Sequence, residues 1–87
     1  MKIEEVKEII SKEKLEFGIN SARLYSLNGK AKIILIAKNA KKSHKIEIEN
    51  NCKRSGVKCE ELNLNSDELG AMCGKPFNIS FVTVVKE

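Results

Sequence analysis

The pattern of apolar and polar positions is clearest after Gly29, where a run of apolar residues leads directly into a lysine-rich segment. Residues 33–37 are consecutive apolar side chains, mostly β-branched, and this pattern is typical of a strand buried on both faces. Such a strand lies in the middle of a sheet, with helices packed above and below it. In open α/β sheets, ligands gather beyond the carboxyl ends of central strands. The lysine-rich segment that follows residue 37 is therefore a candidate binding surface.

Helix and strand patterns alternate along the rest of the chain. Residues 2–14 place Ile3, Val6 and Ile10 on one face and Glu and Lys side chains on the other, which predicts an amphipathic helix. A glycine at position 56, directly after basic residues, is typical of a helix end. The predicted helices span residues 2–14, 19–28, 43–55 and 65–73, and the predicted strands span residues 15–17, 32–37, 57–64 and 78–85.

The second predicted helix has two candidate apolar faces. Leu24 and Leu27 define one stripe, and Ala22, Tyr25 and Ser26 define another. Both stripes have helical spacing, so the sequence leaves open which face packs on the sheet.

The alternating order of these elements predicts a three-layer α/β/α sandwich built on a four-stranded mixed sheet. The chain has 87 residues, of which 41% are hydrophobic, and this size suits a single domain over residues 1–87. The sequence shows no internal repeats, linkers or low-complexity segments.

The charge balance narrows the classes of partner. Sixteen Lys and Arg residues against twelve Asp and Glu residues leave a net charge of +4, which favours nucleic acid over acidic substrates or membranes. No stretch approaches the ~20 apolar residues of a membrane span. The start of the chain also lacks the apolar segment of a signal peptide. We therefore expect an intracellular protein without a membrane partner.

Cysteine and histidine usage argues against a metal site. Cys52, Cys59 and Cys73 form no CxxC pair, and His44 is the one histidine in the sequence. A structural zinc site with four ligands is therefore not expected. The cysteines are interpreted as free thiols in a reducing compartment.

The sequence also lacks the motifs expected of common enzyme classes. It contains no GxxxxGK[ST], GxGxxG or GxSxG motif. His44 falls in the polar first turn of a predicted helix, where a solvated or capping role is favoured over a catalytic one. Cys73 precedes Gly74-Lys75-Pro76, but a small buried apolar residue is favoured there over a reactive thiol. We therefore expect neither catalysis nor a cofactor.

The first candidates for RNA contact lie at the start of the second predicted helix. Gly18 lets RNA approach the backbone closely, and the free N–H groups of a helix start favour a phosphate. The Asn20 amide offers a donor and an acceptor to a base edge, although the same residue could act as a helix cap. Spacing alone leaves these two roles of Asn20 open.

Further candidates lie in two later loops. Asn39 follows the central strand and offers a second amide, with a plain turn residue as the alternative. The lysines around it offer phosphate contacts, with a solvated charge run as the alternative. Phe77 follows Gly-Lys-Pro and could either stack on an unpaired base or anchor the last strand in the core. The lysines in question are Lys38, Lys41, Lys42 and Lys45.

Three segments together resemble one protein family. They are Phe17-Gly18-Ile19-Asn20, the segment GKAKIILIAKNA over residues 29–40, and the segment ELGAMCGKPF over residues 68–77. The family that they resemble is the archaeal and eukaryotic large-subunit ribosomal protein L-thirty-e, within the L-seven-Ae kink-turn-binding superfamily. The resemblance covers nearly the whole chain, and the combination of the last two segments is specific.

This resemblance implies a four-stranded α/β/α fold that binds a kink-turn, a sharply bent RNA internal loop. It places Gly18 and Asn20 against tandem sheared G·A pairs. Asn39 would contact a nearby base or the backbone, and Phe77 would pack against the RNA. The implied partners are ribosomal RNA and neighbouring ribosomal proteins in the cytoplasmic ribosome, with a monomer expected outside that particle. The full set of expected RNA-binding residues is Gly18, Asn20, Ser21, Arg23, Lys38, Asn39, Lys42, Lys75 and Phe77.

The chain departs from the family pattern at four places. Ser21 stands where an acidic or amide residue is common, and its reach is shorter. Leu24 stands where Lys or Arg is usual, and Arg23 lies one position earlier. Either Arg23 makes the phosphate contact or the grip on RNA is weaker there. Lys41 replaces a common proline, and the chain stops at Glu87 without the Asp-Pro-Gly tail that many relatives carry.

Three functions stay open on the sequence alone. The leading one is a structural RNA-binding protein of the large ribosomal subunit that recognises a kink-turn by shape, G·A edges and phosphate charge. The second is a free kink-turn protein of guide-RNA or RNase P particles, which Ser21 and the Gly-Lys-Pro-Phe loop argue against. The third is a small protein-interaction domain that has kept the fold and lost RNA binding, which the exchange at Arg23 and Leu24 supports.

Overall fold

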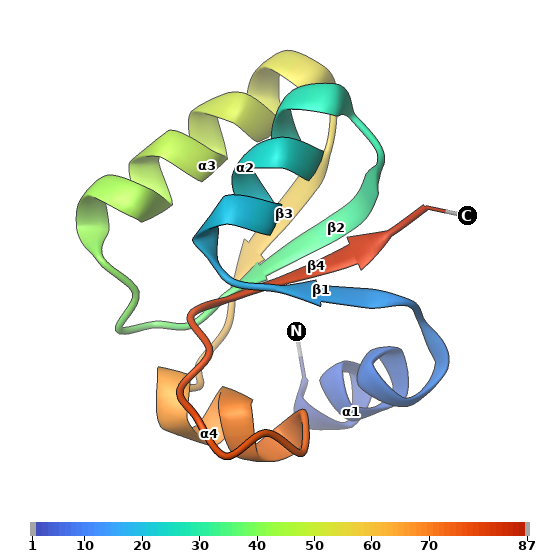
Figure 1. Ribbon diagram of the computed structural model, residues 1–87, viewed down its shortest axis with the longest axis vertical. Coiled ribbons are helices and arrows are strands. Elements are labelled where there is room, and N and C mark those ends of the chain that lie inside the picture. Colours follow the sequence, from blue (N-terminus) through green and yellow to red (C-terminus); the bar gives the residue numbers. More distant parts are fainter. Residues whose placement is uncertain (1, 87) are drawn as a thin grey trace.

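The computed structural model describes residues 2–86, and helices and strands alternate along them as the sequence predicts (Figure 1). The expected chain end at Glu87 lies outside the described residues. Within residues 2–86, no helix has the length and apolar character needed to cross a membrane. The elements are α1 (Ile3–Lys12), β1 (Leu15–Phe17), α2 (Ile19–Asn28), β2 (Ala31–Ile36), α3 (Lys42–Ser55), β3 (Lys58–Glu61), α4 (Ser66–Met72) and β4 (Phe81–Val85).

The strands of residues 2–86 form one mixed, four-stranded sheet in the order β1-β4-β2-β3. β4 pairs antiparallel with both of its neighbours, whereas β2 and β3 pair in parallel. The strand predicted from the apolar run, β2, therefore lies in the interior of the sheet. Because β4 runs opposite to β1 and β2, the carboxyl ends of β1 and β2 lie at the same edge as the start of β4.

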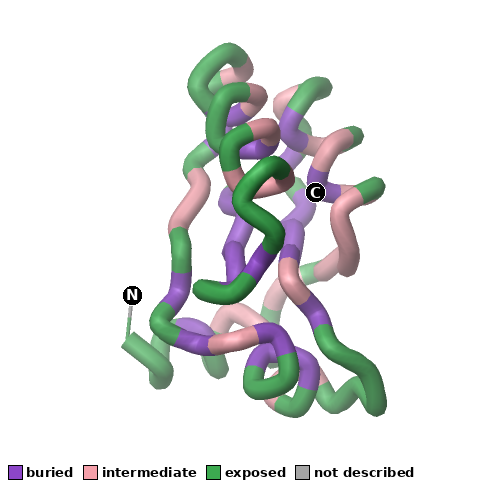
Figure 2. The backbone as a smooth tube through the Cα atoms, turned by 90° about the vertical axis from the view of Figure 1, so that its left-hand side faces the viewer, coloured by how far each residue is buried: buried purple, intermediate pink, exposed green. Residues whose placement is uncertain are grey.

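Helices cover both faces of this sheet, with α2 and α3 on one face and α1 and α4 on the other (Figure 1). Ile33 and Leu35 of β2 pack with Val6 of α1 and Leu69 of α4, whereas Ile34 packs among residues of α2 and α3. This alternation follows from the two-residue side-chain period of a strand. Figure 2 shows buried positions through the middle of the molecule and exposed ones on the outer turns. The predicted three-layer α/β/α sandwich is confirmed.

Helix α2 packs on the sheet through the face that carries Ala22 and Ser26. Both residues are 0% exposed, while Leu24 and Leu27 are 58% and 64% exposed. Small side chains let α2 approach the sheet closely. The Ser26 hydroxyl also accepts a hydrogen bond from the Asn51 amide of α3 at 3.3 Å, so burial does not leave it without a partner. Of the two candidate stripes, the one with Ala22, Tyr25 and Ser26 is therefore the one that packs inward, with Tyr25 half-buried.

Two strands are shorter than the sequence predicts. The strand predicted over residues 57–64 is confined to Lys58–Glu61, and the one predicted over residues 78–85 is confined to Phe81–Val85. Beyond these ends the regular strand pairing stops, and several of the excluded residues bond to α4 and the loops. For example, the Ile79 N–H donates to the carbonyl of the first residue of α4 at 3.0 Å.

The start of α4 is closed by reciprocal hydrogen bonds between Asn65 and Glu68. The Asn65 side chain accepts from the Glu68 N–H at 3.3 Å, and the Glu68 carboxylate accepts from the Asn65 N–H at 3.1 Å. This capping box satisfies two N–H groups that a helix start otherwise leaves without partners. The helix start predicted at Asn65 is confirmed.

Candidate nucleic-acid interface

The expected RNA-binding residues come mainly from three segments that meet at one edge of the sheet. These are the start of α2, the turn over residues 38–40 after β2, and the loop over residues 73–80 before β4. The Gly18 N–H donates to the Phe81 carbonyl at 3.0 Å, which ties α2 to the start of β4. The Ala37 N–H donates to the carbonyl of the residue before Phe81 at 2.8 Å, which ties the turn to the same loop. The fold thus brings together segments far apart in sequence.

Helix α2 begins at Gly18 without a side-chain cap. Gly18 has φ 94° and ψ 170°, a backbone conformation that is essentially reserved for glycine. Its carbonyl accepts a hydrogen bond from the Ala22 N–H at 3.2 Å, so the helix starts directly behind it. The N–H groups of the first turn of an uncapped helix start, together with the helix dipole, favour an anion such as a phosphate.

Substitution of Gly18 by alanine is expected to lower the free energy of unfolding by about 1–3 kcal/mol, because alanine is strained in this backbone conformation. A Cβ at Gly18 would meet no atom within 4 Å, so backbone strain is the sole cause. Denaturant unfolding measures the loss. Gly56→Ala, at the far end of α3, is the control: it also has a positive φ of 78°, but it should leave RNA affinity unchanged. An equal affinity loss in both variants would contradict the assignment of Gly18 to the interface.

Asn20 lies inside α2 and is exposed. Gly18 is the N-cap residue, so the capping interpretation of Asn20 is wrong. The Asn20 side-chain oxygen accepts a hydrogen bond from Arg23 Nη1 at 3.4 Å. Ser21, the next residue, is half-buried. The Asn20 amide is therefore available on the surface, with its orientation influenced by Arg23.

Arg23 is committed to an ion pair with Glu47 of α3. Its Nε donates to one carboxylate oxygen at 2.6 Å, and its Nη2 donates to the other at 3.1 Å. The hydrogen bonds from Arg23 hold the pKa of the Glu47 carboxyl below its usual value. Sequence reasoning did not identify Glu47, because a partner 24 positions away is set by the packing of α2 on α3.

Asn39 is an exposed residue of the turn after β2, and it is bound to the start of α4. Its side-chain oxygen accepts from the Ser66 N–H at 2.7 Å, and its amide nitrogen donates to the Ser66 hydroxyl at 3.3 Å. The turn-residue interpretation is therefore confirmed. One N–H and one lone pair of the Asn39 amide stay available for a further partner.

The lysines of this region divide into two groups. Lys38, Lys41 and Lys42 are exposed and can reach phosphates. Lys45 is instead used within the fold: its Nζ donates to the Lys38 carbonyl at 2.7 Å and pairs with Glu61 at 3.1 Å. The expectation that Lys45 contacts phosphate is corrected accordingly, because its ammonium group serves to hold the turn after β2.

Phe77 lies on the wall of an open groove of about 440 Å³ next to the start of α2. Its side chain is 55% exposed, whereas Phe81 is 1% exposed and fills the core position at the start of β4. The core-anchor interpretation of Phe77 is therefore wrong. Lys75 Nζ lies 5.3 Å from the centroid of the Phe17 ring, a cation–π arrangement beside the groove. Gly18 lines the same groove, so the helix start and the exposed ring share one concave surface.

The groove also contains His44, which sequence reasoning did not place there. The sequence predicts a solvated or capping His44, but the side chain is half-buried, and the N-cap of α3 is Lys41. The His44 ring lies 6.3 Å from the Phe81 ring at a tilt of 58°. Packing of the first turn of α3 over the start of β4 explains this position. A single histidine in a polar turn carries no sequence signal of such a contact.

The cysteines are poor nucleophiles in this fold. Burial raises the pKa of Cys52 to about 12, and burial is also the main cause of the raised pKa of Cys59 and Cys73. A thiol that stays protonated at neutral pH reacts slowly. The reactive-thiol interpretation of Cys73 has no support: Cys73 packs against the apolar core, and burial raises its pKa more than the nearby Lys75 lowers it. Among residues 2–86, no group of three or more His, Cys, Asp or Glu side chains could hold a metal ion.

We expect Cys52, Cys59 and Cys73 to react with a thiol-alkylating reagent much more slowly in the native protein than in denaturant. Mass spectrometry after timed alkylation at neutral pH measures the three rates. Replacing each cysteine by Ala or Ser should retain RNA binding at some cost in stability, because the side chains serve packing. Rapid native alkylation of Cys52 would contradict this assignment.

The surface at this edge of the sheet indicates the kind of ligand that the protein can bind, and the sequence identifies its family. An uncapped helix start beside exposed lysines and an exposed aromatic residue suits a polyanion such as nucleic acid. The chain belongs to the Ribosomal protein L7Ae/L30e/S12e/Gadd45 family, whose sequence model matches residues 1–87. Membership of this family confirms the resemblance drawn from the sequence, and it confirms that the chain is not an enzyme.

Named relatives agree with this family assignment, and two solved structures share the fold. The large ribosomal subunit protein eL30 of Saccharolobus solfataricus is 30% identical over 83 residues, which cover 95% of this chain and 77% of the relative. The protein of the same name from Sulfurisphaera tokodaii is 32% identical over 81 residues, which cover 93% of this chain and 76% of the relative. The Giardia lamblia 15.5kD RNA binding protein superposes with a TM-score of 0.73 at 24% identity, covering 94% of this chain and 68% of that one. A protein of unknown function from Bacillus halodurans superposes with a TM-score of 0.79 at 16% identity, covering 93% of this chain and 80% of that one.

Proposed function

We propose that this chain is an RNA-binding structural protein of the large ribosomal subunit that recognises a kink-turn in ribosomal RNA. The observation that carries the proposal is that the uncapped start of α2, with the exposed Asn20, lies beside the exposed Phe77 at one edge of the sheet. An irregular RNA loop offers phosphates, base edges and unstacked bases, and this edge presents a matching group for each. The names of the similar relatives support the ribosomal part of the proposal.

Each group has a distinct role in this proposal. The first-turn N–H groups of α2 and the exposed lysines Lys38, Lys42 and Lys75 contact phosphates, which gives affinity without sequence information. Asn20 contacts a base edge of the sheared G·A pairs, and Phe77 packs on an unstacked base. The whole chain acts as one domain, as a monomer outside the ribosome and beside neighbouring ribosomal proteins within it.

Asn39 has a smaller part in this scheme than the resemblance implies. Because Ser66 already occupies one donor and one acceptor position of its amide, only the remaining capacity can serve RNA. Loss of Asn39 would also remove two of the hydrogen bonds between the turn after β2 and the start of α4. We therefore regard Asn39 chiefly as the residue that holds the turn after β2 in place for its neighbouring lysines.

The test is a titration of the protein against a kink-turn RNA and against the same RNA with its G·A pairs changed to Watson–Crick pairs. Tight binding to the first RNA and loss of binding to the second is the expected result. Affinity should also fall steeply as the salt concentration rises, because several phosphate contacts release counterions. Equal, weak and salt-sensitive binding to both RNAs would contradict kink-turn recognition and indicate a basic surface without specificity.

A second candidate function is a protein-interaction domain that has lost RNA binding. Two observations favour it: Leu24 and Leu27 expose 58% and 64% of their surface on α2, and Arg23 is held by Glu47 rather than free for phosphate. The RNA titration separates the two candidates, because this alternative expects no discrimination between the two RNAs.

A further inference from the structure

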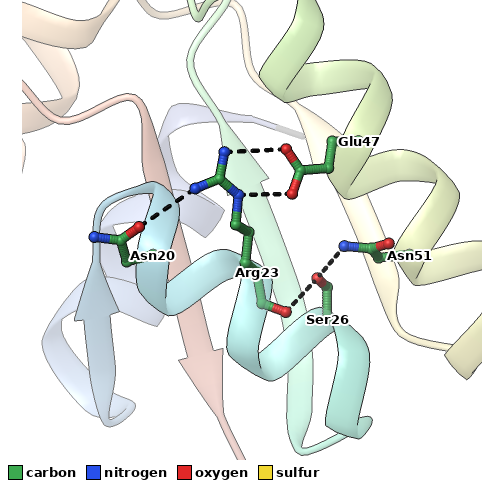
Figure 3. A network of polar contacts seen from close by, with 5 residues as sticks. All are labelled: Asn20, Arg23, Ser26, Glu47 and Asn51. Atoms are coloured by element: carbon green, nitrogen blue, oxygen red, sulfur yellow. Dashed lines mark hydrogen bonds and ion pairs between the residues drawn. The ribbon is translucent and has the colours of Figure 1, made fainter.

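The polar network around Arg23 joins Asn20 of α2 to Glu47 of α3 (Figure 3). Arg23 Nη1 donates to the Asn20 side-chain oxygen at 3.4 Å, and the same guanidinium donates twice to the Glu47 carboxylate, at 2.6 and 3.1 Å. A planar guanidinium with two such bonds to one carboxylate has a fixed orientation. Arg23 therefore presents its remaining N–H groups to Asn20 from a defined direction.

This direction decides which end of the Asn20 amide faces outward. Arginine has donors and no acceptor, so it can bond only to the amide oxygen of Asn20. The Asn20 oxygen accordingly points to Arg23, and the NH2 group points away from it (Figure 3). Without this partner, an exposed amide could rotate by half a turn and present either end to RNA. With it, the surface presents two N–H donors, which suit acceptor atoms on a base edge.

Attraction of an RNA phosphate by the positive charge explains the position of Arg23 less well than orientation of the Asn20 amide does. The paired carboxylate neutralises the guanidinium locally, and the two side chains are similarly exposed, at 40% and 38%. A phosphate would have to compete with this carboxylate for the same N–H donors. The Arg23–Glu47 pair is therefore better suited to orienting the Asn20 amide than to attracting a phosphate.

We propose that Arg23 and Glu47 form a positioning pair that orients the Asn20 amide, so that both residues contribute to RNA recognition through Asn20 rather than by touching phosphate. This inference rests on the proposed function and deepens it, because it assigns recognition roles to a residue on α3. Arg23 and Glu47 are positioning residues, and Asn20 is the residue that meets the base.

The variant Glu47→Ala separates this proposal from simple electrostatics, because the two expect opposite results. If charge alone mattered, removal of a carboxylate near RNA and release of Arg23 would tighten binding and increase the salt dependence by about one phosphate contact. The positioning pair instead predicts that discrimination between the kink-turn RNA and its Watson–Crick control falls by about three- to tenfold, the size of a typical coupling between contacting residues.

The control is Glu49→Ala, which removes the same charge from an exposed position of the same helix. Positions 47 and 49 do not share a helix face, so Glu49 lies off the Arg23 network. Its removal should leave discrimination unchanged. The Glu47→Ala variant should also fold, because a second tie holds α2 to α3: Asn51 donates to Ser26 at 3.3 Å, and Ser55 donates to the Ser26 carbonyl at 2.6 Å.

A double-mutant cycle and an RNA-free measurement complete the test. Asn20→Ala should cost less discrimination in the Glu47→Ala background than in the wild type, because the amide is already disordered there. In the free protein, NMR relaxation of the Asn20 side-chain NH2 should show a rigid amide that becomes mobile in Glu47→Ala but not in Glu49→Ala.

The outcomes distinguish failure of this proposal from failure of the proposed function. A wild type that discriminates between the two RNAs, with unchanged discrimination in Glu47→Ala, would overturn the positioning pair alone. Equal Asn20 mobility in wild type and Glu47→Ala would overturn it without any RNA. A wild type that binds both RNAs equally would overturn the kink-turn function, and the positioning role with it.

Discussion

Substitution of Gly70 by alanine is expected to lower the free energy of unfolding by about 1–3 kcal/mol, in the range of an overpacked core. A Cβ at Gly70 would lie 2.1 Å from the Phe77 carbonyl oxygen and 3.5 Å from the Asn78 Cα. The first distance is far shorter than any van der Waals contact, and the obstacle is backbone, which cannot rotate away. The loop before β4 must therefore move as a whole. Denaturant unfolding, with m-values compared, measures the stability loss.

The same substitution should weaken RNA binding, because the displaced loop carries Phe77 and one wall of the groove. Ala71→Gly is a suitable control, since this exposed neighbour lies on the same helix and its replacement costs roughly 0.5–1 kcal/mol through helix propensity alone. The control should lose stability and keep its RNA affinity. A Gly70→Ala protein with native stability and native affinity would show that α4 does not set the position of the loop.

The order of the elements follows from local sequence signals, and for that reason it could be predicted. The apolar run of β2 indicated an interior strand, and alternation of helix and strand patterns indicated a layered sandwich. The ends of β3 and β4 could not be predicted in the same way. Leu62 and Ile79 have strand-like neighbours, but their N–H groups bond to β2 and to α4, respectively, beyond the ends of their strands. Long-range partners decide such boundaries.

In the candidate site, too, roles set by local sequence could be predicted, and roles set by long-range contacts could not. Gly18 and Asn20 could be predicted because a glycine and an amide at a helix start carry a local meaning. The exposure of Phe77 could not be settled, because the sequence does not reveal that Phe81 fills the core instead. The roles of Lys45 and Glu47 depend on contacts 16 and 24 positions away, with Glu61 and Arg23, and charge patterns alone do not identify such pairs.

Substitution of Asn20 by alanine is expected to reduce the affinity for a kink-turn RNA by about 1–3 kcal/mol, the range of a lost base-edge contact. The side chain is exposed, and its hydrogen-bond partner within residues 2–86, Arg23, keeps both bonds to Glu47 when Asn20 is shortened. The free energy of unfolding should therefore change by no more than about 0.5 kcal/mol, as is usual for surface substitutions. Titration of RNA with each variant, beside denaturant unfolding, measures both quantities.

Two further variants identify the part of the amide that matters. Asn20→Asp keeps the size and the oxygen but removes the NH2 donors and adds a negative charge, so it should lose more affinity than Asn20→Ala. Asn50→Ala, at an exposed position in the second half of α3, is the matched asparagine control and should bind as the wild type does. If Asn20→Ala kept wild-type affinity, the start of α2 would act through its backbone alone. The ordering Asp below Ala below wild type would instead show that the Asn20 side chain itself meets the RNA, because loss of its amide and introduction of a negative charge at the same position each weaken binding.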